Sequence, residues 1–533
     1  VAMVENTAPV VTLVAPTGTQ ANPTLIPVTK PAIGWTQTDS MLTTFTAFQV
    51  HILSESGTMV LDSGVIDQNT TSNSGSWTVS SVLPVNQKLQ VKVRVSDGVV
   101  WSEWSPVGWM LVSPSLTTVP GVAAGGSYSL ALKADGTVWA WGENSYGQLG
   151  DGTTTSRTTA IQIPGLSEIV QVSVGGGHSV ALKNDGTVWT WGYNGSGQLG
   201  DGTTTNRRSP VQVPNLTDVI AIAAGSGYTV ALKSDGTVWA WGLANNGRLG
   251  NGVTSGVFSS PVQVTGLTGV VAISASSNGA TTLALKSDGT VWGWGDGSRA
   301  QLGMGRGSNN PVPVQINELS GIRAISMGTE HGLAVKQDGT LWAWGNNGAG
   351  RLGDGTNDTR YTPIQITDGI KGISAGRNSS MAIKTDGTVW TWGDNYFGQL
   401  GDGTTTLRLS PVKINGLANV TAVAMGYNHA LAMTSDGTVW AWGNNSYGQL
   451  GNGTTTNSST PVAMVENMAP VVTLVAPTGT QANPTVVNIE QPSISWQQND
   501  ASLTVFTAFQ VQILSESGTM VLDSGVIDQN TTS

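Results

Sequence analysis

The amino-acid sequence predicts an all-β protein in which a seven-bladed β-propeller is joined to a two-sheet β-sandwich, with a second, partial sandwich at the C-terminus. The first supporting observation is an eight-residue phrase, Asp-Gly-Thr-Val-Trp-Ala-Trp-Gly at residues 135–142, that recurs in seven similar copies. The second is a series of short β-rich runs before the first copy. The third is the recurrence of residues 1–72 as residues 462–533. Self-similarity at a fixed period of roughly 20–50 residues is typical of repeat architectures.

The composition suits a turn-rich β protein and argues against several partners. The chain has 533 residues, with 70 Gly, no Cys, 11% charged residues and a net charge of −10. Because no basic patch is available to neutralise phosphates, we expect no nucleic-acid partner, and attraction to an anionic membrane surface is equally disfavoured. No run of about 18 apolar residues is present, so this segment is not expected to insert into a membrane. The lack of Cys excludes disulfides and thiolate metal sites.

Residues 8–112 are predicted to form the first sandwich. Clusters of Pro, Gly, Asn and Asp separate its short β-rich runs, which favours two packed sheets. The predicted strands are 10–14, 32–37, 45–54, 59–62, 77–80, 88–96 and 107–112.

A Trp-Ser-Glu-Trp-Ser sequence follows the strand predicted at 88–96. Alternate residues of that strand face the core, so Lys92 and Arg94 are expected on its outer face. Trp101 and Trp104 are expected to stack on these cations, each contact contributing about 0.5–1 kcal/mol. The domain resembles the fibronectin type III family, and the sequence is similar to the Trp-Ser-x-Trp-Ser box of cytokine receptors. We interpret the box as convergence on one stacking solution, which does not imply cytokine binding.

Residues 113–467 are predicted to form the propeller. The seven phrases begin 50, 50, 53, 50, 48 and 50 residues apart. Each unit has four strand-like runs, which in the third unit are 219–224, 229–233, 237–242 and 261–264. Asp-Gly before Thr-Val-Trp predicts a two-residue type I′ hairpin turn.

The two Trp of each phrase share one face of a strand, and a small residue between them lies on the other. Sheets with one bulky and one slim face are expected to stack bulky on slim around a ring. The predicted structural Trp are Trp139, Trp141, Trp189, Trp191, Trp239, Trp241, Trp292, Trp294, Trp342, Trp344, Trp390, Trp392, Trp440 and Trp442.

The full repeat is specific enough to identify a family resemblance. Residues 175–200 have the pattern Gly-x-x-His-Ser-x-Ala-Leu-Lys-x-Asp-Gly-Thr-Val-Trp-x-Trp-Gly-x-Asn-x-x-Gly-Gln-Leu-Gly. This pattern resembles the regulator of chromosome condensation repeat family, whose members fold as seven-bladed propellers. The best-known member is a nuclear exchange factor bound to chromatin, a role that the acidic charge does not support here. Another branch includes secreted bacterial propellers that inhibit β-lactamases by gripping them with one face, so a face of the fold is able to bind proteins.

A larger repeat of 461 residues spans the chain. Residues 1–72 align without a gap on residues 462–533, with 57 of 72 positions identical. Residues 1–7 are therefore expected to be the closing strand and linker of a preceding propeller, and residues 468–533 the first part of the next sandwich. We expect the sequence to be an excerpt of a longer bacterial tandem-repeat protein.

Repeat chemistry explains most residues that resemble catalytic or metal sites. His178, His331 and His429 share a position that also accepts Tyr, which favours packing over zinc binding. The Gly-Asp-Gly-Thr loops at Asp151, Asp201, Asp354 and Asp402 offer one carboxylate each, too few for calcium. The phrase aspartates are expected in turns. We therefore predict no catalytic residue, no metal and no cofactor.

The fourth unit departs from the pattern and is the predicted binding loop. It is two residues longer at residues 276–282 and lacks the Asn-x-x-Gly turn. The residues proposed for binding are Ser276, Ser277, Asn278, Asp296, Arg299 and Arg306.

Two functions follow from these features, and an enzyme ranks third. In the first, the chain is a non-catalytic structural unit of a long extracellular or cell-surface fibre, stalk or adhesin, and its partners are neighbouring repeat units. In the alternative, one face of the propeller binds a host or surface protein or a glycan.

Overall fold

The structure is a computed structural model that describes residues 6–16, 19–20, 24–26, 32–40, 44–81, 83–84, 87–112, 116–305 and 307–467. Beyond residue 467 it describes the strand segments 471–476, 495–499, 505–509, 512–514, 520–523 and 527–532. Within these residues the molecule is built from strands, with a single short 3-10 helix (η1, Asn245–Gly247). None of the described residues forms a helix with the length and hydropathy that crossing a bilayer requires.

The N-terminal domain consists of two sheets. One sheet has the order β1-β3-β7, and the other the order β2-β9-β8-β4-β5, with β6 also paired to β4. The strands are β1 (Val10–Ala15), β2 (Thr24–Ile26), β3 (Ala32–Thr38), β4 (Phe45–Ser54), β5 (Met59–Asp62), β6 (Ile66–Thr70), β7 (Ser74–Thr78), β8 (Lys88–Ser96) and β9 (Gly108–Val112). The sequence prediction missed the short β2 and the polar β6, and it placed β7 three residues too late.

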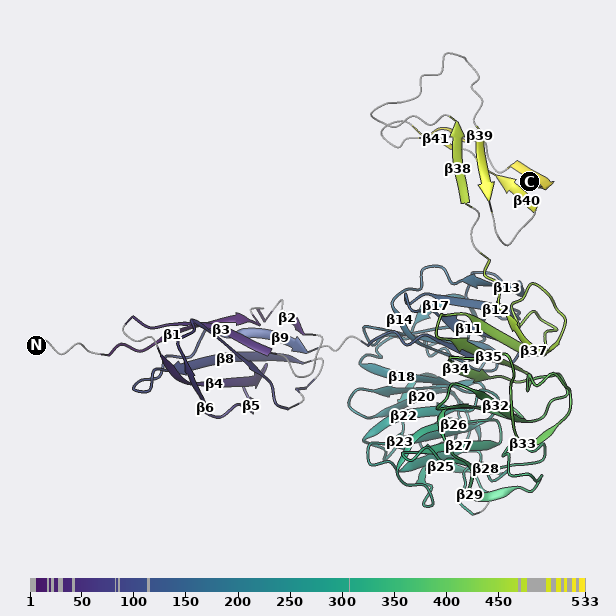
Figure 1. Ribbon diagram of the computed structural model, residues 1–533, viewed down its shortest axis with the longest axis horizontal. Helices are drawn as coiled ribbons and strands as arrows, with labels where there is room; N and C mark the ends of the chain where they lie inside the picture. Colours follow the sequence, from purple (N-terminus) through teal and green to yellow (C-terminus); the bar gives the residue numbers. More distant parts are fainter. Residues whose placement is uncertain are drawn as a thin grey trace, which may run out of the picture.

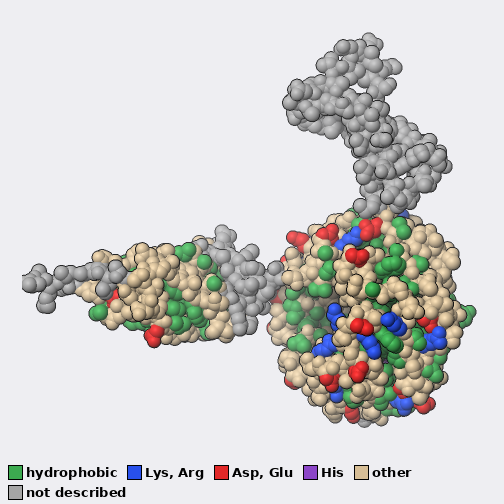
Figure 2. Space-filling view, viewed as in Figure 1, with side chains coloured by type: hydrophobic (Ala, Val, Ile, Leu, Met, Phe, Trp, Pro, Cys, Tyr) green, Lys and Arg blue, Asp and Glu red, His purple; other side chains and the backbone are tan. Residues whose placement is uncertain are grey.

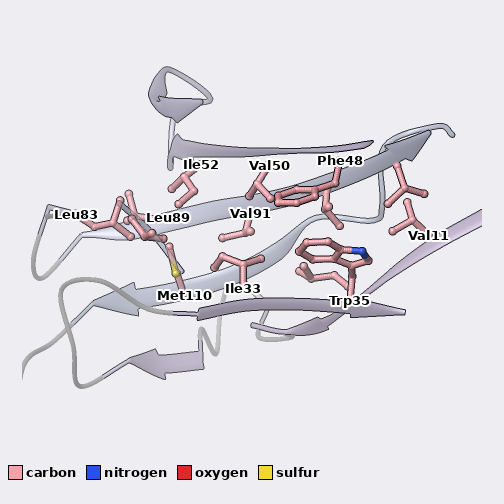
Figure 3. Close-up of a cluster of buried hydrophobic side chains, with 14 of the residues drawn as sticks. Val11, Ile33, Trp35, Phe48, Val50, Ile52, Leu83, Leu89, Val91 and Met110 are labelled. Atoms are coloured by element: carbon pink, nitrogen blue, oxygen red, sulfur yellow. The ribbon is translucent and has the colours of Figure 1, made fainter. Parts of the chain in front are cut away.

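The core of this domain lies between the two sheets. Figure 3 shows Ile33 and Trp35 of β3 pointing toward Phe48 and Val50 of β4. Alternate residues of β8 are fully buried, and the residues between them are half-buried, as the period of two along a strand requires. Burial of Trp35 at 1% exposure leaves its indole N–H inside the core, where it donates to Gln37 Oε1 at 3.0 Å.

Seven four-stranded antiparallel sheets follow, each made of four consecutive strands (Figure 1). In blades one to three the strands are β10 (Gly121–Ala124), β11 (Tyr128–Leu132), β12 (Val138–Gly142), β13 (Arg157–Gln162), β14 (Ile169–Val174), β15 (His178–Lys183), β16 (Val188–Gly192), β17 (Arg207–Gln212), β18 (Val219–Ala224), β19 (Tyr228–Lys233), β20 (Val238–Leu243) and β21 (Val257–Gln263). In blades four and five they are β22 (Val270–Ala275), β23 (Thr281–Lys286), β24 (Val291–Gly295), β25 (Asn310–Gln315), β26 (Ile322–Met327), β27 (His331–Lys336), β28 (Leu341–Gly345) and β29 (Arg360–Thr367). In blades six and seven they are β30 (Ile370–Ala375), β31 (Ser379–Lys384), β32 (Val389–Gly393), β33 (Arg408–Lys413), β34 (Val420–Met425), β35 (His429–Thr434), β36 (Val439–Gly443) and β37 (Ser458–Ala463).

The seven sheets form a closed ring with the first strand of each blade innermost. First strands of successive blades contact one another, and β10 of blade one contacts β34 of blade seven. The fourth strands begin earlier than predicted: β21 starts at Val257, where the expected start was 261.

The hairpin turn of the phrase differs from the prediction. Gly136 has a φ of +78°, but Asp135 is not in the left-handed region, so the two-residue type I′ turn is wrong. Instead, the N–H of Gly136 donates to the carbonyl of Lys133 at 3.0 Å, and Lys133 N–H donates to Thr137 O at 3.0 Å. This is a three-residue loop in which a type I turn ends in one left-handed glycine. Asp135 fixes it by accepting hydrogen bonds from the backbone N–H and the hydroxyl of Thr137.

Each seam between blades joins a bulky face to a slim one. Ala140 of blade one packs in the same buried cluster as Trp191 of blade two, and Ala441 of blade seven packs in the same cluster as Trp141 of blade one. The second Trp of every phrase donates its indole N–H to a backbone carbonyl of the preceding blade, over 2.8–3.1 Å. This Trp therefore serves both as a wedge and as a hydrogen-bonded link.

A second set of bonds follows the outer edge of the ring. A glycine N–H in the loop before each fourth strand donates to the fourth strand of the next blade, at 2.9 Å in all seven seams. At the closing seam, Gly453 donates to Thr158 O. The chain beyond β37 adds a short parallel bridge, in which Ala160 N–H donates to Val465 O at 2.9 Å.

The strands after the ring repeat the pairings of the first sandwich. β38 (Val471–Ala476) pairs with β39 (Ser495–Asn499) as β1 pairs with β3. The remaining strands are β40 (Val505–Phe509), β41 (Gln512–Leu514), β42 (Met520–Asp523) and β43 (Ile527–Thr532). The same registers, offset by 461 residues, recur in two further pairs: β40 pairs with β43 as β4 pairs with β6, and β41 pairs with β42 as β4 pairs with β5.

Candidate binding face

The alternation of strands gives the ring two chemically different faces. The loop face carries the turns between first and second strands and the long loops between third and fourth strands. The turn face carries the Asp-Gly hairpins and the connectors between blades. Figure 2 shows that charged side chains are sparse on the viewed side of the propeller, where most of the surface is uncharged.

The predicted binding loop of blade four lies on the loop face, close to the axis. Ser276 is fully buried, and its carbonyl accepts a hydrogen bond from Ser226 N–H of blade three at 3.1 Å. A side chain added at Gly176 of blade two would place its Cβ 3.7 Å from Ser277 O. The two additional residues of this repeat therefore reach past blade three toward blade two. Arg306, the last residue of the predicted set, lies outside the described residues.

Arg299 and Asp296 of the predicted set lie farther out, in the loop between the third and fourth strands. Arg299 Nε lies 3.9 Å from Glu330 Oε1 of blade five. The other oxygen of Glu330 accepts from Asn346 Nδ2 at 2.6 Å and lies 3.4 Å from Arg351. Asp296 instead caps its own loop by accepting from Ser298 N–H at 2.9 Å. The structure thus assembles a network around Glu330, which the sequence analysis did not identify.

Several buried polar atoms beside this network lack a hydrogen-bond partner within the described residues. They are Ser276 Oγ, Asn278 Nδ2, Thr329 Oγ1 and Arg351 Nε. Arg351 is 5% exposed, and burial lowers the pKa of its guanidinium. Enclosed polar atoms of this kind are commonly satisfied by internal water.

Aromatic side chains gather on the other half of the loop face. Three of them occupy the same repeat position, two residues before the Gln of the Gly-Gln-Leu-Gly sequence in the loop after the third strand. They come from the consecutive blades six, seven and one: Phe397, Tyr447 and Tyr146. The same position carries Ser196, Asn246, Arg299 and Ala349 in the other blades. We call Tyr146, Tyr193, Tyr396, Phe397, Tyr427 and Tyr447 the aromatic arc.

Most side chains of the aromatic arc are open to solvent or stacked on each other, whereas the half-buried Tyr427 lies against Arg377, whose guanidinium is 3.9 Å from its ring. Tyr396 is 75% exposed, Tyr447 49% and Tyr146 44%. The rings of Tyr146 and Tyr193 lie 4.9 Å apart across the seam between blades one and two. Sequence reasoning missed this set because it compared the lengths of the loops and not their chemistry at a single position.

The Gly-Asp-Gly-Thr loops prove to be the site of four ion pairs. Asp402 Oδ2 lies 2.8 Å from Arg408 Nη2, while its Oδ1 accepts from Asn395 Nδ2 and from Thr404. Burial acts to raise the pKa of Asp402, but the hydrogen bonds from Thr404 and Arg408 outweigh it and hold the pKa below the ordinary value. The equivalent pairs are Asp151–Arg157, Asp201–Arg207 and Asp354–Arg360. These carboxylates are therefore occupied by protein donors.

The three repeat histidines lie in the seams and are neutral. Their Nε2 atoms lie 2.8–2.9 Å from hydroxyl oxygens of the next blade, on Thr229, Ser380 and Ser129. Each hydroxyl donates its own hydrogen to a backbone carbonyl, so each histidine must donate from Nε2. Burial lowers the pKa of His178 to about 3 and that of His429 to about 4. These residues join blades, and they do not converge on one point.

Within the described residues no group of three or more His, Asp or Glu side chains is placed to hold a metal ion.

In the sandwich, the structure brings together the four residues of the predicted Trp and cation stack. Lys92 Nζ lies 4.8 Å from the Trp104 ring, and the Arg94 guanidinium lies 4.7 Å from Trp101 and 4.8 Å from Trp104. The serines of the motif, which the sequence analysis left without a role, bond to β8: Val95 N–H donates to Ser102 Oγ and Val93 N–H to Ser105 Oγ.

Comparisons with known proteins identify the ring. The regulator of chromosome condensation (RCC1) repeat matches residues 135–182 and 185–232, and a second model of this repeat matches residues 121–148, 169–198 and 219–248. The RCC1-like domain matches residues 259–496, which extends past the last strand of the ring. No curated protein matches the sequence.

Three solved structures share the fold at low identity. Yeast RCC1 (Prp20), in a complex with Kap60, is 22% identical with a TM-score of 0.56, over 66% of this chain and 85% of that one. Prp20p from Saccharomyces cerevisiae is 23% identical with a TM-score of 0.56, over 63% and 87%. Human WBSCR16 is 21% identical with a TM-score of 0.56, over 63% and 96%. Seven four-stranded sheets, repeat matches within residues 121–248, a domain match over residues 259–496 and this shared fold lead to one conclusion: the chain contains an RCC1-like repeat β-propeller domain.

Proposed function

We propose that the chain is a non-catalytic structural unit of a long secreted or cell-surface fibre, stalk or adhesin, in which sandwiches and propellers alternate. The observation that carries this proposal is that strands on the two sides of the ring share the same registers, offset by 461 residues. The ring is closed by bonds of its own seven blades, so it needs no strand from a neighbouring unit. Closed rings joined by short segments suit a linear array.

The sandwich supports this reading because its strand order fits a fibronectin type III-like domain. The chain crosses between the two sheets from β1 to β2, from β2 to β3, from β3 to β4, from β6 to β7 and from β7 to β8. Such Greek-key crossings are typical of this architecture, which recurs in cell-surface proteins.

Electron microscopy of the full-length natural protein tests the proposal. We expect thin, linear particles in which propeller-sized densities recur at a constant spacing. Separate compact particles, with no regular spacing between rings, would count against a fibre.

The aromatic arc supports a second function, binding of a protein or a glycan by the loop face. Its loops consist mainly of Tyr, Asn, Ser and Gly, as at residues 142–147 and 443–448. Tyrosine offers a large, rigid contact area with a polar tip, and loops of this composition on a rigid scaffold are typical of protein-binding surfaces. Of the two ligand classes, the arc therefore favours a protein.

This second function is tested by screening the labelled chain against arrays of extracellular proteins and of glycans. A triple variant, Tyr146→Ser, Tyr396→Ser and Tyr447→Ser, is expected to lose any ligand found, whereas the matched blade-four variant Arg299→Ser is expected to retain it. If the triple variant still binds the ligand and Arg299→Ser does not, the binding site is the blade-four loop predicted from the sequence.

A further inference from the structure

The seam between blades seven and one contains a cavity of about 830 Å³ on the turn face. Its apolar walls include Val119, Pro120, Met433, Val439 and Met464. Its lining also contains the charged residues Lys133, Asp135, Asp436 and Glu466, and the turn residues Ala134 and Gly437. A mainly apolar cavity of this size with a few directed polar groups is typical of a binding site.

The other seams explain what this cavity is shaped to hold. In them, the connector between blades packs into the equivalent space and buries an apolar side chain at the start of the next first strand. That residue is at most 3% exposed in all six connectors: Ile169, Val219, Val270, Ile322, Ile370 and Val420. Five connectors bury a leucine as well: Leu166, Leu216, Leu267, Leu319 and Leu417.

Connectors also make backbone bonds with the hairpin turns. In all six, the carbonyl of the residue just before the buried apolar one accepts from the hairpin turn of the blade that this connector enters, as Asn419 O accepts from Ser435 N–H at 3.0 Å. In five of the six, all but the connector at Val420, the N–H of the apolar residue also donates to the turn glycine of the preceding blade, as Val270 N–H donates to Gly236 O at 3.3 Å. At the seam of blades seven and one, the corresponding groups are Ala134 N–H and Gly437 O. Neither makes such a bond within the described residues, and both line the cavity.

The chain's own segment before blade one has the pattern of a connector but lies elsewhere. One repeat of 50 residues relates Leu116 and Val119 to Leu166 and Ile169. Val119 is nevertheless 68% exposed, and Leu116 packs with Val170 on blade two.

Backbone conformation explains why this segment does not fill the cavity. In each of the six connectors, the residue directly before the buried apolar one has a φ between +56° and +69°: Glu168, Asp218, Gly269, Gly321, Gly369 and Asn419. In the segment before blade one the equivalent residue is Thr118. A β-branched residue is strongly disfavoured in that region, and Thr118 instead donates its hydroxyl to Ile169 O at 3.0 Å.

We infer that this cavity is a binding site for a peptide segment of a partner protein that follows the pattern of the connectors at residues 266–270 and 416–420: Gly-Leu, one further residue, then Gly or Asn, then Val or Ile. The leucine enters the apolar space between Met433 and Met464. The peptide carbonyl before the Val accepts from Ala134 N–H, and the Val N–H donates to Gly437 O. The acidic rim formed by Asp135, Asp436 and Glu466 favours a lysine beside this pattern, although Glu466 also pairs with Lys133 at 2.5 Å.

The test uses the full chain and a fluorescent peptide with the sequence of residues 413–422, Lys-Ile-Asn-Gly-Leu-Ala-Asn-Val-Thr-Ala. Fluorescence anisotropy is expected to give saturable binding, weakened at least tenfold when the leucine of the peptide is replaced by alanine. In the protein, Ala134→Pro removes the N–H donor at a turn position that tolerates proline, and it is expected to weaken binding at least fivefold. The matched variant Ala134→Ser keeps the donor and is expected to bind as the parent does.

Three results would overturn the inference. They are no saturable binding, equal binding of the alanine peptide, and equal binding by the Ala134→Pro chain with its unfolding transition unchanged. Analytical ultracentrifugation of the same variants tests whether a second copy of the chain occupies the cavity. If the parent chain dimerises, Ala134→Pro abolishes the dimer and the peptide does not bind, the cavity is assigned to a second copy.

Discussion

The indole N–H of Trp141 donates to the backbone carbonyl of Gln449 at 2.8 Å, joining the first blade to the seventh across 308 residues of sequence. The carbonyl of Gln449 also accepts from Ser129 Oγ at 2.9 Å. This pair of residues joins the closing seam in the same way that six equivalent pairs join the other seams, although within the described residues the connector bonds on the turn face are missing there.

Replacing Trp141 by Phe tests how much this link stabilises the ring. The substitution removes a buried donor and part of a fully buried ring, and we expect a loss of about 1–3 kcal/mol in the free energy of unfolding of the propeller. The control is Trp189→Phe, whose indole N–H donates only to Thr187 of its own turn at 3.2 Å. Urea unfolding followed by Trp fluorescence is expected to show the larger loss at Trp141, and an equal loss would contradict the role of the inter-blade bond.

The contribution of the Asp402–Arg408 ion pair to stability can be measured by replacing both residues with their counterparts from blade seven. Blade seven has Asn452 and Ser458 at these two positions. Asp402→Asn alone leaves the Arg408 guanidinium, 34% exposed, without its anion, and we expect it to destabilise the propeller by about 1–3 kcal/mol. The double variant Asp402→Asn, Arg408→Ser reproduces the blade-seven pair and is expected to recover most of that loss. A double variant less stable than the single one would show that the arginine is needed for another contact.

The buried histidines predict a loss of stability in mild acid. Their folded pKa values, about 3 for His178 and about 4 for His429, lie below the ordinary value of 6.5, and His331 is shifted in the same direction. Between these values the unfolded chain binds more protons than the folded one, so stability is complete above about pH 6.5 and falls as the pH decreases. Three such groups give a slope of about 4 kcal/mol per pH unit.

A substitution already present in the repeat tests the origin of this slope. Tyr occupies the histidine position in blades one and three, as Tyr128 and Tyr228. His178→Tyr removes one titrating group and is expected to reduce the slope between about pH 6 and pH 5 by about one third. The measurement is the urea midpoint of the propeller, compared above about pH 5, where the aspartates with lowered pKa values are still mostly ionised in the unfolded chain as well, because their ordinary pKa is 3.8. An unchanged slope would assign the acid sensitivity to other groups.

The ring was predictable because its cause is local and repeated. A period of 50 residues, two Trp with a small residue between them and four short runs per unit leave few architectures that bury all these side chains. The ion pairs were also within reach of the sequence, since the four loops with Asp have Arg six residues later and the loops with Asn at 251 and 452 have Val257 and Ser458 instead.

Other features required coordinates because they depend on contacts between distant segments. The hairpin turn was mistaken because Asp-Gly permits both a two-residue and a three-residue loop, and Lys133 decides between them through its bonds. The aromatic arc forms only when the ring closes and blade seven lies between blades six and one. The empty seam arises because Thr118 does not take the conformation that Asn419 takes in the preceding connector, a difference that no hydrophobic pattern reveals.

Substitutions at two turn glycines, Gly236 and Gly437, test without any ligand whether the seam of blades seven and one is empty. A Cβ added at Gly236 would lie 3.0 Å from Gly269 N of the connector, whereas one added at Gly437 would meet nothing within 4 Å. Both residues have similar positive φ values, +79° and +85°, so Ala at either site incurs a similar conformational cost of about 1–2 kcal/mol. Gly236→Ala also crowds a packed connector, and we expect it to lose at least about 1 kcal/mol more than Gly437→Ala. Equal losses in urea unfolding would mean that the seam of blades seven and one is filled in solution as the seam of blades three and four is filled.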